Sequence, residues 1–317
     1  MFEFVLHVAI MACLYGMLAL SLNLQVGFAG LVNFGQIILF GAGTYGAALA
    51  FANGFGPVAG LVLGVAFSTV IAVAFSALGR NLGSDYWGIA TLAVAEVLRI
   101  LLTNEVWLTG GAQGIAGIPL IFGDLPRPTG PLLTLGLCVA ILAAAWWFCR
   151  RLTESRFGLA LKLIREEPLL ALSLGYDLNA ARTATLVVAG AMAALSGFVF
   201  AHYVTFVGPD QLVAAETFLI WAMVIIGGSG NHLGAIVGAI LMQFLFAFVP
   251  FIKDALGAPA EYVAAMRLTL VGGGLLVFLM WRTQGLVPER IGGAAPAGAR
   301  PAEGRPAKAQ MAEKRNG

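Results

Sequence analysis

The sequence predicts an all-α fold, a polytopic transmembrane bundle of about nine helical spans, on three observations. Hydrophobic residues make up 60% of the 317 residues and charged residues only 11%, whereas soluble domains carry about 25% charged residues. Apolar runs recur along the chain, each near the ~20 residues that cross a bilayer. Lys and Arg gather in two places between or after these runs. A soluble fold cannot bury this much apolar surface, so lipid must cover part of it.

Nine runs fit a span by length and composition. The uncharged stretch from Thr217 to Ile252 is too long for one helix, and Gly227–His232 divides it. The second and seventh spans hold glycines and polar residues, so they are the ones predicted to be broken or re-entrant. The predicted spans are Phe4–Val26, Leu31–Ala52, Val58–Leu78, Tyr86–Leu102, Leu132–Cys149, Thr183–Val207, a short span that starts at Thr217, Leu233–Ile252 and Leu268–Trp281.

The basic residues predict the orientation, because loops rich in Lys and Arg stay in the cytoplasm. Six lie between 150 and 182, and seven follow the last span. With both groups inside, the N-terminus is outside, the C-terminus is cytoplasmic, and fourteen of the eighteen basic residues, Arg80 included, fall on the cytoplasmic side. Residues 1–290 are then the membrane domain. Residues 291–317, rich in Ala, Pro and basic residues, are expected to form a disordered cytoplasmic tail.

The polar segment 150–181 has the pattern of two short helices rather than a loop. Apolar residues recur at helical spacing from Phe157 to Ile164, with charged residues on the other faces. Pro168 predicts a break, and Gly175 suits the end of a second helix. Such a pair fits docking of a soluble partner. A pair lying on the lipid headgroups is an equal alternative on physical grounds, since the basic residues favour that too.

A series of motifs accompanies this segment in a fixed order over about residues 15–287. They are Gly27–Gln36, Gly41–Tyr45, Asp85–Leu92, Thr109–Pro119, Ser155–Pro168, Ala171–Tyr176, Phe206–Asp210, Gly227–Asn231 with Gly234, and Arg282–Leu286. Together they resemble the permease subunits of branched-chain amino acid ABC transporters, of the LivM type. Each motif is weak alone, and their joint order is specific.

The resemblance implies a permease subunit of an ATP-binding cassette importer in a bacterial inner membrane. It implies alternating access for branched-chain amino acids or similar small solutes, with residues 1–290 as the permease domain. The expected partners are a sister permease subunit (LivH-like), two cytoplasmic ATPase subunits, an extracytoplasmic substrate-binding protein and the lipid bilayer, with no nucleic acid. The ATPase subunits would use the ATP, so this chain is expected to be no enzyme and to hold no cofactor.

The resemblance also assigns residues of segment 150–181 to contact with the ATPase. Gly158 is expected to let the partner backbone approach closely. The contact candidates are Arg156, Gly158, Ala160, Leu161, Ile164, Arg165 and Glu166.

The glycine-rich stretch Gly110–Gly117 is not a nucleotide-binding loop, because no Gly-Lys-Ser or Gly-Lys-Thr follows to meet phosphates. We expect a tight extracytoplasmic turn there. The three cysteines and three histidines are dispersed, so the sequence predicts no metal site.

The second and seventh spans are also the candidates for the substrate pathway, since interrupted helices commonly line one. Glycine-mediated helix packing is the alternative explanation of the same pattern. Glu216 is expected near the outer end of its span as a ligand or gate. The pathway candidates are Asn33, Gln36, Thr44, Tyr45 and Glu216.

Two charges lie within the fourth span. Glu96 and Arg99 are three residues apart, so they share a helix face and are predicted to form an intramembrane ion pair. Pairs of small residues four apart, such as Gly60 and Gly64, predict tight helix contacts elsewhere.

Two other functions are compatible with the composition. A self-sufficient secondary transporter would need intramembrane titratable groups, for which Glu96 and Glu216 are the only candidates. A channel for small polar solutes would not need a helical segment with an apolar face in the cytoplasm. The sequence does not separate leucine, isoleucine and valine from urea, amides or aromatic acids as the solute.

Overall fold

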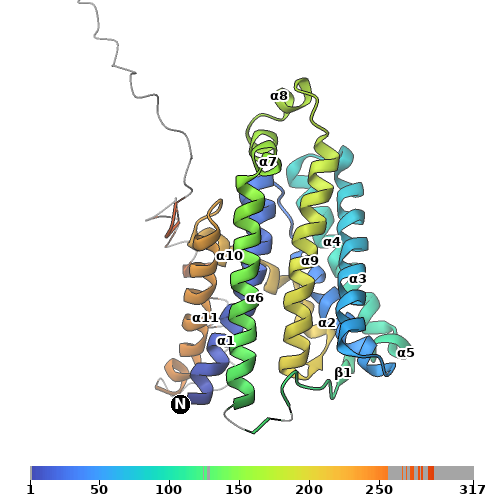
Figure 1. The fold of residues 1–317 in the computed structure, drawn as a ribbon, viewed down its shortest axis with the longest axis vertical. Coiled ribbons are helices and arrows are strands. Elements are labelled where there is room, and N and C mark those ends of the chain that lie inside the picture. The colour runs from blue at the N-terminus through green and yellow to red at the C-terminus, as the bar shows by residue number, and fades with distance from the viewer. Residues whose placement is uncertain are drawn as a thin grey trace, which may run out of the picture.

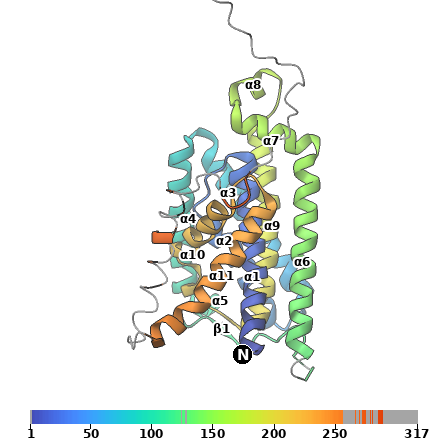
Figure 2. The same cartoon turned by 90° about the vertical axis from the view of Figure 1, so that its left-hand side faces the viewer.

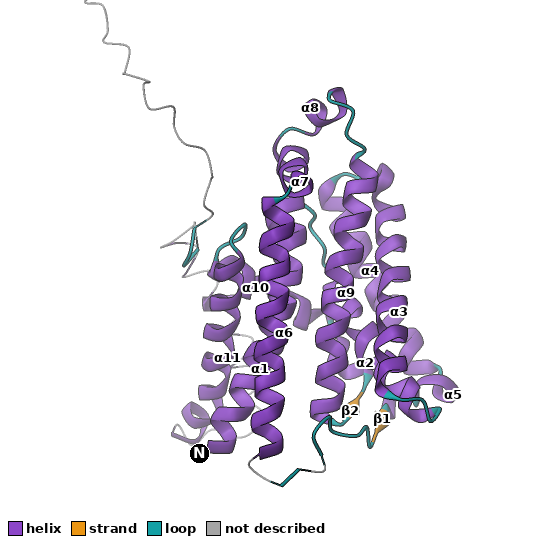
Figure 3. Cartoon of the chain, viewed as in Figure 1, coloured by secondary structure: helices purple, strands orange, loops and turns teal. Residues whose placement is uncertain are grey.

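The computed structural model describes residues 2–123, 125–126, 129–255 and 285–288, with isolated residues between 266 and 280. The described part consists of helices joined by loops, with two two-residue strands, β1 (Ile115–Ala116) and β2 (Phe206–Val207) (Figure 3). These pair antiparallel, with Ile115 opposite Val207. The predicted all-α class is confirmed.

The long helices run alongside one another in a single bundle (Figure 1). A π-helix, η1, continues the first of them and ends before the second begins. The elements are α1 (Phe2–Asn23), η1 (Leu24–Phe28), α2 (Gln36–Ala52), α3 (Pro57–Leu78), η2 (Gly79–Asn81), α4 (Ser84–Asn104), α5 (Val106–Thr109), η3 (Gly111–Gln113), α6 (Thr129–Glu154), α7 (Arg156–Glu166), α8 (Pro168–Ser173), α9 (Leu178–Val204), η4 (Pro209–Leu212), α10 (Ala214–Gly227) and α11 (His232–Ala255).

Among the described residues, six helices are long and apolar enough to cross a membrane. They correspond to the first, third, fourth, fifth, sixth and eighth predicted spans. The second and seventh correspond to α2 and α10, which have only 17 and 14 residues. The ninth predicted span, Leu268–Trp281, is described only at isolated residues, so the count of nine stays a prediction. The tail 291–317 lies outside the described residues.

The interior of the bundle is built on α1, α2, α9 and α10. In the most apolar stretch of α1 and of α9, 67% of the residues are buried. The corresponding share is 17% for α6 and 22% for α4, so these two helices lie at the outside of the bundle. A Cβ added to Gly43 of α2 would overlap the Ala194 carbonyl of α9, and one on Gly46 would overlap the Gly64 backbone of α3. Helix α2 is thus held between two neighbours at backbone contact, as small residues allow.

The other predicted small-residue contacts are present as well. Gly60 faces Ala47 of α2, and Gly190 faces Ser68 of α3. Gly234 and Gly238 of α11 both face Gly227 of α10. Glycine-mediated packing therefore explains much of the glycine content.

The two ends of the bundle differ in what they carry. Helices α7 and α8 lie at one end, and the N-terminus, α5 and β1 lie at the other (Figures 1 and 2). The glycine-rich turn belongs to this second end. Gly110, Gly111, Gly114 and Gly117 all have positive φ, between 61° and 82°, as a tight turn requires.

Candidate functional site

Between η1 and α2 the chain leaves helical geometry although it lies inside the bundle. Residues 30–34 form no helix, and Gly30 has a φ of +66°. Irregular backbone at membrane depth is tolerated only where protein or water satisfies its polar groups. Other parts of the chain satisfy these groups. The Leu31 N–H donates to the Gln25 carbonyl (2.9 Å), and Trp221 Nε1 donates to the Asn33 carbonyl (2.9 Å). Two threonine hydroxyls also accept: the Phe34 N–H donates to Thr91 Oγ1 (3.1 Å) and the Ile37 N–H to Thr217 Oγ1 (3.2 Å).

A cluster of four polar side chains lies beside this break, and all four are fully buried. Gln25 Nε2 donates to Gln36 Oε1 (2.7 Å), and Asn33 Nδ2 donates to Gln25 Oε1 (2.9 Å). Gln36 Nε2 donates to Ser21 Oγ (2.9 Å), and Ser21 Oγ donates to the Ala189 carbonyl (2.6 Å). We call Ser21, Gln25, Asn33 and Gln36 the polar cluster. Its members satisfy one another's hydrogen-bonding groups inside the bundle.

The predicted pathway residues therefore do not form one site. Asn33 and Gln36 meet in the polar cluster. Thr44 is buried and donates to the Gly41 carbonyl of its own helix. Tyr45 lines a separate apolar cavity of 580 Å³ between α2, α3 and α4. Within the described part of the chain its hydroxyl has no hydrogen-bond partner.

Glu216 lies in the first turn of α10, at the end of its span, and its place on the outer side of the membrane stays a prediction. The Tyr15 hydroxyl donates to Glu216 Oε2 (2.9 Å), and Tyr15 is midway along the first span, Phe2–Phe28. Helix α10 has only 14 residues, so its first turn lies beside the interior of the first span rather than at that span's end. A carboxylate inside a membrane bundle is costly, so we expect Glu216 to have a functional role.

Glu96 and Arg99 form the ion pair that their spacing predicts. Arg99 Nε donates to Glu96 Oε2 at 2.9 Å. Asp210 of η4 also acts electrostatically on Arg99. Both side chains of the pair are partly exposed on the outside of this chain.

Helix α7 turns its apolar face toward this chain's own bundle. Gly158, Ala160, Leu161 and Ile164 are all buried. A Cβ on Gly158 would overlap the carbonyl of Thr153 at the end of α6. The expected role of Gly158, admitting a partner backbone, does not fit, because its own chain already occupies that space.

The charged candidates of α7 divide between two faces. Arg156 and Glu166 are exposed. Arg165 points inward, and its Nη1 donates to the carbonyl of Gly27 in η1. Of the seven predicted contact residues, only Arg156 and Glu166 are thus exposed.

The inner face of α7 belongs to a packed unit with η1 and the start of α11. The Lys162 ammonium lies 5.4 Å from the Phe28 ring centroid, and Phe28 stacks on His232 at 4.6 Å. His232 Nε2 is 2.9 Å from Thr153 Oγ1. Asn23 Oδ1 accepts from the Gly230 N–H (2.9 Å). Helix α7 therefore contacts the segment that leads into the polar cluster.

The outer face of α7 and α8 carries exposed leucines. Leu159 is 63% exposed, Leu169 80%, Leu172 54% and Leu174 63%. We call these four the leucine surface. It lies at the end of the molecule, and the described part of this chain does not cover it.

A family model described as branched-chain amino acid transport system / permease component matches residues 4–280. The chain belongs to this family of permease components. It is a multi-pass membrane protein and not an enzyme. It is 29% identical over 310 residues to the high-affinity branched-chain amino acid transport system permease protein LivM of Salmonella typhimurium, covering 89% of this chain and 69% of that one.

Two further relatives of the permease span different fractions of its length. A probable branched-chain amino acid transport permease protein LivM of Methanocaldococcus jannaschii is 27% identical, over 87% of this chain and 91% of that one. The autoinducer 2 import system permease protein LsrC of Yersinia pestis is 29% identical, over 60% of this chain and 52% of that one.

Sequence reasoning missed several residues that the permease places at these sites. Ser21 and Gln25 complete the polar cluster, Tyr15 holds Glu216, and His232 joins α6, α11 and η1. Ser21 and Gln25 are polar residues within an otherwise apolar run, which is a usable signal. Tyr15 and His232 carry no such signal, since their partners are more than 70 residues away.

Proposed function

We propose that this permease pairs with a sister permease subunit, that two cytoplasmic ATPase subunits drive the pair, and that an extracytoplasmic binding protein supplies its solute. The names of the LivM relatives support branched-chain amino acids or similar small solutes as the cargo. The autoinducer 2 import relative indicates that this architecture also serves other small molecules. The family of permease components supports partners of these kinds.

The leucine surface is the observation that carries the docking proposal. Helix α8 lies beyond the ends of α6 and α9 (Figure 1), farther along the bundle axis than the spans themselves. A helix pair lying on lipid headgroups would instead stay level with the ends of the spans. Several exposed leucines at one end of a molecule are typical of a protein interaction site. We infer that the ATPase binds α7 and α8 through these leucines, with Arg156 and Glu166 beside them.

The same assignment sets the orientation. Arg80, Arg150, Arg151 and Arg156 lie at the end of the bundle that carries α7 and α8, so the positive-inside rule supports a cytoplasmic position for that end. The N-terminus and the turn Gly110–Gly117 would then face outward, toward the binding protein.

The contacts of α7 with its own bundle would transmit the movement driven by ATP hydrolysis to the solute pathway. A displacement of α7 would pull on η1 through the Arg165 bond to the Gly27 carbonyl and through the Lys162–Phe28 contact. Gln25 of η1 is bonded to Gln36 and Asn33. A π-helix is a common site of functional rearrangement. We propose that η1 moves with α7 and opens the polar cluster during alternating access.

Uptake in proteoliposomes tests this function. The permease complex should take up labelled leucine only with the ATPase subunits, ATP and binding protein present. Uptake by the permease chains alone along an ion gradient would indicate a secondary transporter, and uptake without any energy source would indicate a channel. Competition by unlabelled valine, urea or an aromatic acid would rank the cargo.

A further inference from the structure

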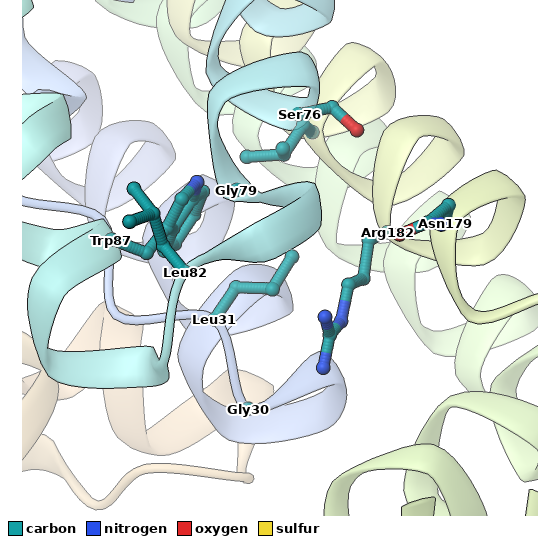
Figure 4. Close-up of a pocket in the computed structure, with 9 residues that line it drawn as sticks. Gly30, Leu31, Ser76, Gly79, Leu82, Trp87, Asn179 and Arg182 are labelled. Atoms are coloured by element: carbon teal, nitrogen blue, oxygen red, sulfur yellow. The ribbon is translucent and has the colours of Figure 1, made fainter.

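A small cavity at the α7–α8 end contains an arginine that the transport proposal does not use. It has a volume of 80 Å³, well above the ~15 Å³ that one water needs. Arg182 extends from α9 toward Gly30 and Leu31, while Trp87 and Leu82 lie on the opposite side (Figure 4). Nε of Arg182 is buried and, within the described part of the chain, has no hydrogen-bond partner.

The cavity offers positive charge without a compensating anion. Its lining residues, as far as the structure describes them, include no acidic side chain. The nearby Asp177 carboxylate already caps α9, accepting from the N–H groups of Asn179 (2.9 Å) and Ala180 (3.0 Å). The Trp87 indole is also engaged, since its Nε1 donates to the Phe75 carbonyl (2.8 Å). Arg182 therefore provides the unsatisfied donor.

The position of Arg182 makes an anion favourable there. It is the fifth residue of α9, one turn beyond the helix end that Asp177 already caps, so the guanidinium itself is the group that would bind an anion. A guanidinium offers parallel donors that match the oxygens of a phosphate. Leaving Nε unbonded in the protein would cost free energy that such a ligand recovers.

The depth and surroundings of the cavity indicate where the phosphate comes from. Ser76 is in the last turn of α3 and Arg182 is near the start of α9, so both lie at the ends of spans, at headgroup level. Leu78, Leu82 and Tyr86, which are close to the cavity in sequence or line it, are exposed. They provide an apolar surface for acyl chains beside a cationic cavity.

We propose that this cavity binds the phosphate of a phospholipid headgroup, with Arg182 as its ligand and the acyl chains lying over α3 and α4. The site is independent of the proposed orientation, because a headgroup lies at this depth in either leaflet. It shares no residue with the leucine surface or the polar cluster, although Gly30 and Leu31 belong to the neighbouring break.

Lipid retention and binding test the site. The full-length permease, purified with its partner subunits, is titrated with phosphatidylglycerol and followed by native mass spectrometry. We expect Arg182→Gln to bind the specific lipid about tenfold more weakly than the wild type, because a charge-assisted hydrogen bond is lost. Arg182→Lys, which keeps the charge and loses the planar fork, should lie between them.

Arg80→Gln is the matched control, because Arg80 is exposed and directly follows Gly79 of the cavity lining. It should bind like the wild type. An equal loss in both glutamine variants would mean a general charge effect and would overturn the site, as would unchanged binding by Arg182→Gln. Inorganic phosphate is the second probe: if it alone stabilises the wild type but not Arg182→Gln, the oxyanion site stands and the lipid source is rejected.

Discussion

Two regions of this permease differ in which side chains they bury: one buries polar side chains and the other exposes apolar ones. Around the break between η1 and α2, four polar side chains are fully buried and bonded to one another. On α7 and α8, four leucines are more than half exposed. In the first region, other atoms of this chain satisfy the hydrogen-bonding groups of the buried side chains. The second is left apolar toward water, which is costly and points to a surface that another chain covers.

The contrast extends to how each region is held. Helix α2 contacts α3 and α9 at backbone distance through Gly43 and Gly46, so it has no room to change shape locally. Helix α7 is anchored on one face only, by Arg165 and by its buried residues Leu161 and Ile164. We therefore expect substitutions around α2 to affect folding and substitutions on the outer face of α7 and α8 to affect assembly.

The largest expected effect is at Gly43. A valine there would overlap the Ala194 carbonyl, and overpacking of this kind costs about 3 kcal/mol or more when backbone must move. Gly43→Val should lose most of its folded, monodisperse protein in detergent, as followed by size exclusion and thermal unfolding. Gly136→Val on α6 is the control, since a Cβ at Gly136 meets no atom within 4 Å. Equal tolerance of both would contradict the close α2–α9 contact.

The next effect is on assembly. Replacing Leu169 and Leu172 by serine should weaken co-purification of the ATPase by about tenfold or more. Burying one leucine contributes roughly 1.5–3 kcal/mol to the free energy of binding, and about 1.4 kcal/mol corresponds to a tenfold change in affinity. Thermal stability of the permease alone should change little, since both side chains are exposed. Phe55→Ser is the control, with an exposed side chain at the opposite end of the bundle. Undiminished co-purification by the double variant would refute the docking surface.

A third effect separates coupling from assembly. Arg165→Gln should keep the ATPase bound, because the guanidinium points inward to Gly27, and should lower solute moved per ATP several-fold. Arg156→Gln, exposed on the same helix, should weaken assembly and leave that ratio unchanged. Uptake and phosphate release are measured on the same proteoliposomes. If Arg165→Gln instead weakens ATPase binding, the route through η1 is wrong.

The smallest effect is expected at the ion pair of α4. Glu96→Gln keeps an amide oxygen beside Arg99, so the guanidinium keeps a hydrogen-bond partner and only the charge attraction of an i, i+3 pair is lost, about 0.2–0.5 kcal/mol on a helix surface. The melting temperature should shift only slightly, with uptake retained. A large loss of uptake without a loss of stability would instead place Glu96 on the solute pathway.

The sequence by itself determined the class and the eight spans that correspond to described helices. Charge depletion, apolar run length and the two basic groups depend only on composition and order along the chain, so they predicted the all-α bundle and the helix pair that the structure places in α7 and α8. Pro168 and Gly175 marked the second short helix, because their backbone preferences act locally. The series of motifs pointed to the permease family for the same reason: it is a property of sequence alone.

Only the tertiary structure decided which way individual side chains face and how deep they lie. Arg156 and Arg165 share one helix, and nothing local shows that one is exposed while the other bonds Gly27 across 138 residues. The pairing of Glu216 with Tyr15 joins residues 201 positions apart, so hydropathy along the chain does not show it. Gln25, Asn33 and Gln36 are satisfied only when η1 and α2 meet. Such pairings are long-range, and burial at these positions is a property of the assembled bundle.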